Sequence, residues 1–318
     1  MSALYLSEAD VAALVDMPQS IACVEEAFRQ LATENADNVP RVRARAPGIV
    51  LHGMIAAAGY LGYVGWKCYT TTRSAARFHV GLYDQLTGEI VALIEADQLG
   101  RLRTGAATGV ALRLMAPAET GEVGLFGVGR QAETQLAAAA TVLPLRRAFV
   151  YSRSEERRAA FAQRMRESLA IDIVPVDRPQ EAAEDLPIVI TATTSAVPVF
   201  GGSWLAEGAV VCAVGSNALT RAEIDATTVR RAEIVVCDSV PACQAEAGDF
   251  VDAREKGVFD WRKAVDLADV LTGRAVGRSR TGGIAIFKSV GLAIEDVAIA
   301  ALIVARAKES GRGVTLPF

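Results

Sequence analysis

Hydrophobic positions in the first third of the chain follow two periodicities. Apolar residues recur at helical spacing in residues 7–15 and 18–34, and Ser7-Glu8-Ala9-Asp10 is typical of a capped helix start. The segments that follow are short and rich in β-branched and aromatic residues, which predicts strands at residues 41–45, 48–54, 60–70, 80–84 and 89–95. This part of the chain is therefore expected to form two helices and a mainly antiparallel sheet.

After a helix predicted at residues 101–115, the pattern changes. Short apolar runs now alternate with longer amphipathic segments, and the predicted strands are residues 123–126, 147–151, 172–176, 188–192, 209–214 and 233–237. Such alternation predicts right-handed crossovers and a parallel, doubly wound sheet. A last helix, predicted at residues 288–308 after the glycines at 282 and 283, would return the chain to the first domain.

The expected fold is thus an α/β chain with two domains. A Rossmann domain, residues 118–300, has the doubly wound parallel sheet. An α+β domain is formed by both chain ends, residues 1–117 and 301–318. The junction is expected near Pro117, because proline ends the preceding helix.

The first strand of the second domain runs into Gly127-Val128-Gly129-Arg130-Gln131-Ala132, a G-x-G-x-x-A pattern followed by a helix. In this setting Gly127 permits the tight turn, Gly129 lets a pyrophosphate approach the backbone, and Ala132 keeps the helix close to the sheet. The free N–H groups of the helix then face the phosphates. The motif predicts a dinucleotide site; an ordinary tight turn is the alternative.

The end of the next strand indicates which dinucleotide binds. NAD sites usually place a carboxylate there for the ribose 2′-hydroxyl, whereas this chain has Ser152-Arg153-Ser154, followed by Arg157 and Arg158. An arginine between two hydroxyls would hold a 2′-phosphate, so NADPH is predicted, with NADH as the alternative. The alternative is that these arginines are a solvated helix start. The predicted cofactor-binding residues are Gly127, Val128, Gly129, Arg130, Gln131, Ser152, Arg153, Ser154, Arg157, Thr193, Val214, Gly215 and Ser216.

Composition narrows the class of protein. The 318 residues carry a net charge of −4, which argues against a general nucleic-acid binder. The apolar run at residues 297–305 is too short to span a membrane, and no signal peptide is visible at the N-terminus. The five cysteines form no C-x-x-C pair, and only two histidines occur. We expect a cytoplasmic, reduced protein without a metal site.

Three cations of the first domain, Arg43, Lys67 and Arg103, are candidates for binding an anionic substrate. Arginine can hold a carboxylate through two parallel hydrogen bonds. Taken singly, each of these residues is more often a surface charge than a ligand.

Several motifs together resemble the ornithine cyclodeaminase/mu-crystallin family over nearly the full length. They are Val42-Arg43, Gly65-Trp66-Lys67, Leu102-Arg103-Thr104-Gly105-Ala106-Ala107, Gly127-Val128-Gly129, Thr191-Ala192-Thr193-Thr194, Val214-Gly215-Ser216 and Ile286-Phe287-Lys288-Ser289-Val290-Gly291. The resemblance implies a homodimer, with the domain built from both chain ends serving substrate binding and dimerisation, and a Rossmann domain that holds NAD(P)(H). It also implies that Arg43, Lys67 and Arg103 bind the substrate carboxylate near the nicotinamide ring.

One position separates the activities of that family. Cyclodeaminases have an aspartate shortly after the turn that corresponds to Val214-Gly215-Ser216, where this chain has Asn217. An amide cannot act as a general base near neutral pH, and Glu223 and Asp225, the nearby carboxylates, are interpreted as a helix start. Asn217 could still hydrogen-bond a ring nitrogen. The expected activity is therefore reduction of a cyclic imino acid, Δ1-pyrroline-2-carboxylate or Δ1-piperideine-2-carboxylate, with Lys67, Arg103 and Asn217 as catalytic residues. The alternatives are a cyclodeaminase, an amino-acid dehydrogenase, and a non-catalytic NADPH-loaded binding protein.

Overall fold

The computed structural model describes residues 3–117, 119–278 and 283–317. The chain divides into two compact units, the first formed by Met1–Ala106 with Gly291–Phe318 and the second by Ala107–Val290. The divisions lie inside a helix and at Gly291, whereas the sequence placed them near residues 117 and 301. The functions that we assigned to the two domains stay predictions.

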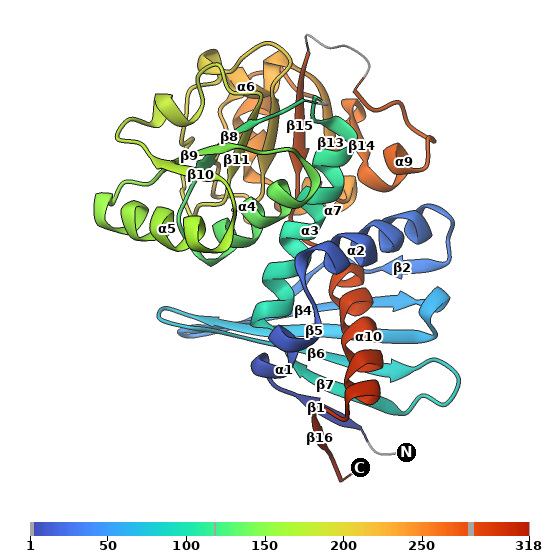
Figure 1. Ribbon diagram of the computed structural model, residues 1–318. Coiled ribbons are helices and arrows are strands. Elements are labelled where there is room, and N and C mark those ends of the chain that lie inside the picture. The colour runs from blue at the N-terminus through green and yellow to red at the C-terminus, as the bar shows by residue number, and fades with distance from the viewer. Residues whose placement is uncertain (1–2, 118, 279–282, 318) are drawn as a thin grey trace. The chain divides into compact units, whose positions relative to one another are not determined.

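The first unit has an eight-stranded, mainly antiparallel sheet (Figure 1). Its strands lie in the order β16-β1-β7-β6-β5-β4-β2, and β3 pairs with β4 outside this path. The strands are β1 (Leu4–Leu6), β2 (Ala36–Asn38), β3 (Val42–Ala46), β4 (Ile49–Ala58), β5 (Tyr63–Thr72), β6 (Ala76–Asp84), β7 (Ile90–Glu95) and β16 (Val314–Thr315). The helices are α1 (Glu8–Leu14), α2 (Met17–Ala32) and α10 (Ala293–Ser310).

Local signals in the sequence explain where these helices begin and end. Ser7 caps α1 in a capping box with Asp10, as predicted, and Gly311 ends α10 in the left-handed conformation that glycine adopts without strain. Helix α10 packs along β4, β5 and β6 and beside α2 (Figure 1). Its buried side chains form the centre of the first unit's core.

The second unit has an eight-stranded parallel sheet in the order β10-β9-β8-β11-β12-β15-β13-β14. Its strands are β8 (Glu122–Phe126), β9 (Arg147–Tyr151), β10 (Asp172–Pro175), β11 (Ile188–Thr191), β12 (Val210–Ala213), β13 (Ala232–Cys237), β14 (Ala264–Asp266) and β15 (Ile284–Lys288). The helices are α4 (Arg130–Val142), α5 (Glu155–Ser168), α6 (Ala226–Arg231), α7 (Val240–Glu246), α8 (Val251–Glu255) and α9 (Leu267–Leu271). Helix α3 (Asp97–Met115) contains the division at residue 106. The predicted doubly wound α/β fold is confirmed.

The prediction of a helix starting at Lys288 was wrong. Residues 284–288 are a fully buried strand between β12 and β13, and α10 begins only at Ala293. A short apolar run fits a buried strand as well as a buried helix, so its pattern alone could not decide. Of the two glycines that we placed before this helix, residue 282 lies outside the described residues.

Candidate functional site

The turn after β8 has the geometry that the glycine motif predicts. Gly127 has φ +104°, and a Cβ at this position would lie 2.5 Å from the carbonyl oxygen of Ala192, so only glycine fits. Gly129 caps α4, and no described atom lies within 4 Å of where its Cβ would be. The N-terminus of a thirteen-residue helix therefore faces open space, as an anion site requires.

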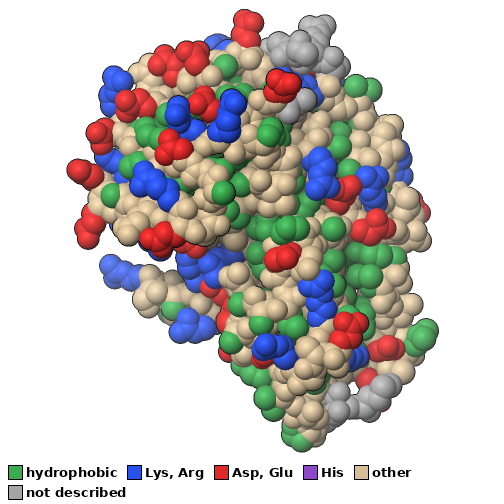
Figure 2. Space-filling view, viewed as in Figure 1, with side chains coloured by type: hydrophobic (Ala, Val, Ile, Leu, Met, Phe, Trp, Pro, Cys, Tyr) green, Lys and Arg blue, Asp and Glu red, His purple; other side chains and the backbone are tan. Residues whose placement is uncertain are grey.

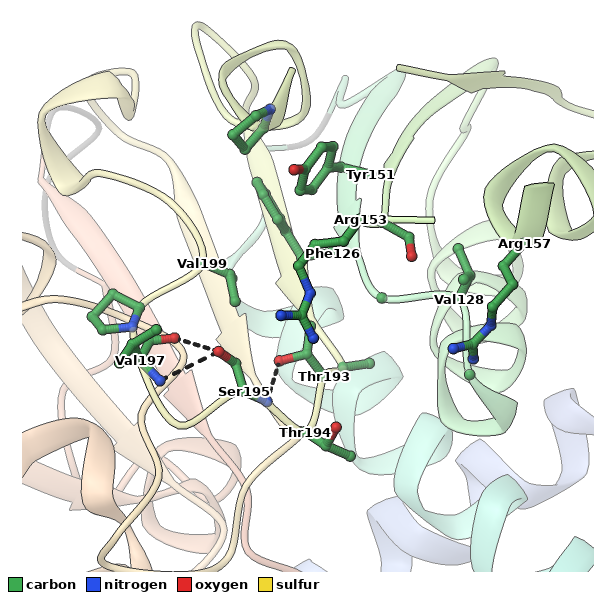
Figure 3. Close-up of a pocket in the computed structure, with 16 residues that line it drawn as sticks. Phe126, Val128, Tyr151, Arg153, Arg157, Thr193, Thr194, Ser195, Val197 and Val199 are labelled. Atoms are coloured by element: carbon green, nitrogen blue, oxygen red, sulfur yellow. Dashed lines mark hydrogen bonds between the residues drawn. The ribbon is translucent and has the colours of Figure 1, made fainter. Parts of the chain in front are cut away.

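A cavity of about 360 Å³ opens at this turn, at the carboxyl ends of β8, β9 and β11 (Figure 3). Seven of the predicted cofactor-binding residues line it: Gly127, Val128, Gly129, Ser152, Arg153, Arg157 and Thr193. The other lining residues are Phe126, Tyr151, Pro179, Ala192, Thr194, Ser195, Val197, Pro198 and Val199. Arg130, Gln131, Ser154 and the segment 214–216 do not line it.

The serines and arginines after β9 divide into two groups. The exposed side chains of Arg153 and Arg157 line the cavity, and Arg153 extends into it (Figure 3). Ser154 instead caps α5, since its hydroxyl accepts a hydrogen bond from the Arg157 N–H at 3.3 Å. The neighbouring Arg158 is buried, where it donates to the carbonyl of Ser152 and pairs with Asp177. Arg153 and Arg157 thus remain the two cations available to a ligand in the cavity.

The loop after β12 lies beside the end of β11. A Cβ on Gly215 would lie within 2.5 Å of a carboxylate oxygen of Glu223, so the close approach of the two loops requires glycine here. Asn217 is half-buried and follows this turn. The interpretation of Glu223 as part of a helix start was wrong, because its side chain is fully buried and accepts hydrogen bonds from Thr193 and Gly215. Asp225, as expected, caps a helix, α6.

In the first unit, two of the three predicted cations lie in one buried cluster. The Lys67 Nζ on β5 is 2.7 Å from a carboxylate oxygen of Asp296 on α10. The Arg103 Nη1 on α3 donates to Glu295 at 3.0 Å, and its Nε lies 3.4 Å from Asp296. Gly291, with φ +85°, leaves space for this guanidinium, since a Cβ there would collide with it.

A further arginine, Arg41, contacts the residue that lies opposite Lys67 in the sheet; it was not among the predicted site residues. Met54 pairs with Lys67 across β4 and β5, and Arg41 donates from Nε to the sulfur of Met54 at 3.3 Å. Its Nη2 also donates to the carbonyl of Gly291 at 3.2 Å. Arg43 pairs with His52 on β4, and the strand register places its side chain on the same face of the sheet as Lys67. We call Arg41, Lys67 and Arg103 the cation cluster.

Burial and charge set the protonation of this cluster. Burial lowers the pKa of Lys67 to about 8, although Asp296 opposes the shift, and the charges of Arg103 and Arg41 lower it further. Burial also disfavours the charge of Arg103, but Asp296 and Glu295 outweigh it and raise its pKa. Lys67 and Arg103 are thus held close together by the carboxylates of Asp296 and Glu295. A pair of cations in this arrangement is suited to a ligand with a carboxylate.

His52 takes no part as a cation. It stacks on Tyr69 with ring centroids 4.2 Å apart and shares a hydrogen bond with Thr71. Burial lowers its pKa to about 4, and the charges of Arg43, Arg41 and Arg45 contribute further. The imidazole is therefore neutral at physiological pH.

Other features of the described residues bear on the class of ligand. Among them, no group of His, Cys, Asp and Glu has the arrangement of a metal site, and their five cysteines are free. None of the helices in the described part of the chain has the length and apolar character of a membrane span. On the face shown in Figure 2, basic and acidic side chains are interspersed.

A doubly wound parallel sheet with a glycine turn after its first strand is characteristic of dinucleotide-binding proteins. The chain belongs to the ornithine cyclodeaminase/mu-crystallin family, whose model matches residues 1–311.

Three relatives illustrate the activities found in this family. The chain is 33% identical over 240 residues to Δ(1)-pyrroline-2-carboxylate reductase of Bacillus cereus, covering 75% of this chain and 74% of the relative. It is 36% identical over 220 residues to a Δ(1)-pyrroline-2-carboxylate/Δ(1)-piperideine-2-carboxylate reductase of Azospirillum brasilense, covering 69% and 67% of the two chains. The solved structure of the Thermococcus litoralis Δ(1)-pyrroline-2-carboxylate reductase with NADH and L-proline superimposes with a TM-score of 0.94 at 32% identity, covering 98% and 100%.

Proposed function

We propose that the protein is an NAD(P)H-dependent reductase of cyclic imino acids that converts Δ1-pyrroline-2-carboxylate to L-proline, and Δ1-piperideine-2-carboxylate to L-pipecolate. The observation that carries the proposal is the buried pair of cations, Lys67 and Arg103, which share the carboxylate of Asp296. The reductase names of the relatives support the same substrate class. The first unit is assigned to the imino acid and the second to the dinucleotide.

In this proposal the cation cluster binds the substrate carboxylate. Arg103 offers a planar guanidinium that is held in place by Glu295, so little conformational entropy is lost when the carboxylate binds. Lys67 keeps its proton below a pH of about 8 and stabilises negative charge or donates a proton at the imine. Reduced nicotinamide, when bound, supplies the hydride. Arg43, on the same sheet face, would add positive potential at the edge of the cluster.

Asn217 favours reduction over cyclodeamination. Loss of ammonia from an amino acid needs a group that accepts a proton, and an amide does not do so near neutral pH. Glu223 does not replace it, because both of its carboxylate oxygens already accept hydrogen bonds from backbone N–H groups. Reduction of an imine that is already formed requires no such base.

Two parallel assays test the proposed reaction. NADPH absorbance is followed with Δ1-pyrroline-2-carboxylate, and ammonia release is measured with L-ornithine and NAD. Oxidation of NADPH with formation of proline and without ammonia release is the expected result. Equal amounts of ammonia and proline from ornithine would instead identify a cyclodeaminase. Binding of the imino acid without oxidation of NADPH would indicate a binding protein.

For the cofactor, we expect the enzyme to bind NADPH about tenfold or more tightly than NADH, with the 2′-phosphate on Arg153. One charge-assisted hydrogen bond is worth about 1.5–3 kcal/mol, which corresponds to roughly 10–100-fold in affinity. Arg153→Asp should reverse the preference, because the carboxylate repels the phosphate and accepts a hydrogen bond from the 2′-hydroxyl.

Calorimetric titration with both dinucleotides measures this preference. Arg164→Asp is the control, since Arg164 lies on the same helix, α5, outside the cavity and pairs with Glu133. It should leave the ratio of the two affinities unchanged. Equal affinities in the parent protein would contradict the assignment of Arg153.

A homodimer is proposed from the family and from the exposed side of the first unit's sheet. Val42, Leu51, Ile55 and Val64 are apolar and exposed, and in the strand register they lie on the face opposite Lys67. Covering this face with the same face of a second copy would remove apolar surface from water. A monomeric mass by light scattering at micromolar concentration would exclude this dimer. A cytoplasmic location stays a prediction.

A further inference from the structure

Three charged side chains are buried below the ends of β11 and β12 in the second unit. Glu223 and Lys288 are fully buried, and Asp249 is 2% exposed. Burying charges is costly unless each finds partners, so such a group persists only where its contacts are nearly complete. We call Glu223, Asp249 and Lys288 the buried triad.

Glu223 joins the ends of two neighbouring strands. Its Oε1 accepts hydrogen bonds from the N–H of Thr193 at 2.6 Å and from the hydroxyl of Thr193 at 2.8 Å, just after β11. Its Oε2 accepts from the N–H of Gly215 at 2.6 Å, just after β12. Distances this short between backbone N–H groups and a carboxylate are typical of charge-assisted bonds.

The other two members hold Glu223 and the loop after β12. The Lys288 Nζ lies 2.7 Å from Asp249 and donates to the carbonyl of Ser216 at 2.8 Å. Asp249 in turn accepts from the backbone N–H of Glu223 at 2.6 Å and of Ile224 at 3.3 Å. The segment Gly215–Ser216 is thus fixed at an N–H by Glu223 and at a carbonyl by Lys288.

The strand order indicates what these loops would contact. The order reverses between β8 and β11, and in doubly wound sheets a dinucleotide crosses the sheet at that point. On this principle the adenosine half would lie over β8 and β9, where Arg153 lines the cavity, and the other half would lie over β11 and β12. Thr193, just after β11, lines the cavity. Val199 lines it too, and its N–H donates to the carbonyl of Glu223 at 2.9 Å.

We propose that Glu223, held by Asp249 and Lys288, is a positioning residue for the nicotinamide half of the dinucleotide. It fixes the spacing of the Thr193 and Gly215 loops, so that their backbone groups are ordered before the cofactor binds. The proposal rests on the dinucleotide site that the proposed function assigns to the second unit. It predicts that replacing Glu223 weakens binding of the nicotinamide half and leaves binding of the adenosine half unchanged.

Glu223→Gln tests whether Glu223 acts on the nicotinamide half of the cofactor alone. A glutamine amide can accept from one of the two backbone N–H groups, but its NH2 group then faces the other as a second donor. We expect the Kd for NADPH to rise about tenfold or more. The Kd for adenosine 2′,5′-bisphosphate, which matches only the adenosine half, should stay within about twofold of the parent value. Calorimetric titration measures both without any turnover.

Asp225→Asn is a matched control. Asp225 lies two residues away and accepts the same set of bonds, from a threonine N–H and hydroxyl and from a glycine N–H, but its donors are Thr228 and Gly202. Asp225 is half-buried, whereas Glu223 is fully buried. A merely structural contribution of a carboxylate with this set of bonds should appear in both variants, whereas positioning of the nicotinamide half should appear only in Glu223→Gln.

The binding measurements distinguish failure of the positioning role of Glu223 from failure of the proposed function. Unchanged NADPH affinity in Glu223→Gln, or parallel weakening of NADPH and the bisphosphate, would overturn the positioning role. If Glu223→Gln does not fold, Thr193→Val is the alternative variant, because it removes only the hydroxyl that donates to Glu223. An unchanged Kd for NADPH in Thr193→Val would then overturn the positioning role. Failure of the parent protein to bind either NADPH or NADH would refute the proposed function and not this assignment alone.

Discussion

Arg103→Ala is expected to lower kcat/KM for Δ1-pyrroline-2-carboxylate at least about 100-fold. A charge-assisted contact to the substrate carboxylate contributes about 1.5–3 kcal/mol, and about 1.4 kcal/mol corresponds to tenfold. A second effect adds to this loss. Without the guanidinium, buried Glu295 and Asp296 each lose an ion pair, so the remaining charges of the cluster are rearranged.

The same change should destabilise the protein. Removing one partner of a buried ion pair typically costs about 3–5 kcal/mol, which thermal unfolding would register as a lower Tm. Arg103→Lys separates the two effects, because it keeps a positive charge near Glu295 but cannot form two parallel bonds to a carboxylate. We expect its stability to recover more than its kcat/KM.

The control is Arg101→Ala, on the same helix. Arg101 is half-buried and pairs with Asp97 and Gln98. Its loss should change kcat/KM less than about threefold, as expected for a partly solvated pair. If Arg103→Ala and Arg101→Ala reduced kcat/KM equally, Arg103 would not belong to the substrate site.

The sequence was sufficient for the dinucleotide fold because its signals are local. The turn at Gly127, the helix after it and the cations that follow β9 lie within one short segment, and the structure places seven of the predicted residues around one cavity. Strand β15 was missed because an apolar run of five residues is compatible with either periodicity, and only its pairing with β12 and β13 decides.

The partners of the cation cluster could not be predicted in the same way. Glu295 and Asp296 are 192 and 229 residues away in sequence from the cations that they contact, and they lie at the start of a helix, where acidic residues are common. Three arginines alternate along residues 41–45, and only the strand register distinguishes Arg41 from Arg43. Glu223 was misjudged for the same reason, since its burial depends on the distant strands around it.

Lys67 makes the proposed reaction dependent on pH. Its pKa of about 8 lies below the ordinary lysine value, because burial disfavours the charged form. The protonated lysine is therefore present below pH 8 and is lost as the pH rises through this value. We expect kcat/KM for the imino acid to fall above pH 8, approaching tenfold per pH unit, in stopped-flow or steady-state measurements. A flat profile to pH 10 would exclude a requirement for this proton.

Asp296→Asn identifies Lys67 as the group that titrates. The Asp296 carboxylate, 2.7 Å from the Lys67 Nζ, raises the lysine pKa and so opposes the effect of burial. Replacing it with a neutral amide removes this stabilisation of the ammonium, and the fall in kcat/KM should move to lower pH. Titration of the imino acid itself is the same in both proteins and cancels in the comparison. In Lys67→Arg the charge persists at every accessible pH, so whatever activity remains should lose the descending limb. A limb that stays at the same pH in Asp296→Asn would mean that another group carries it.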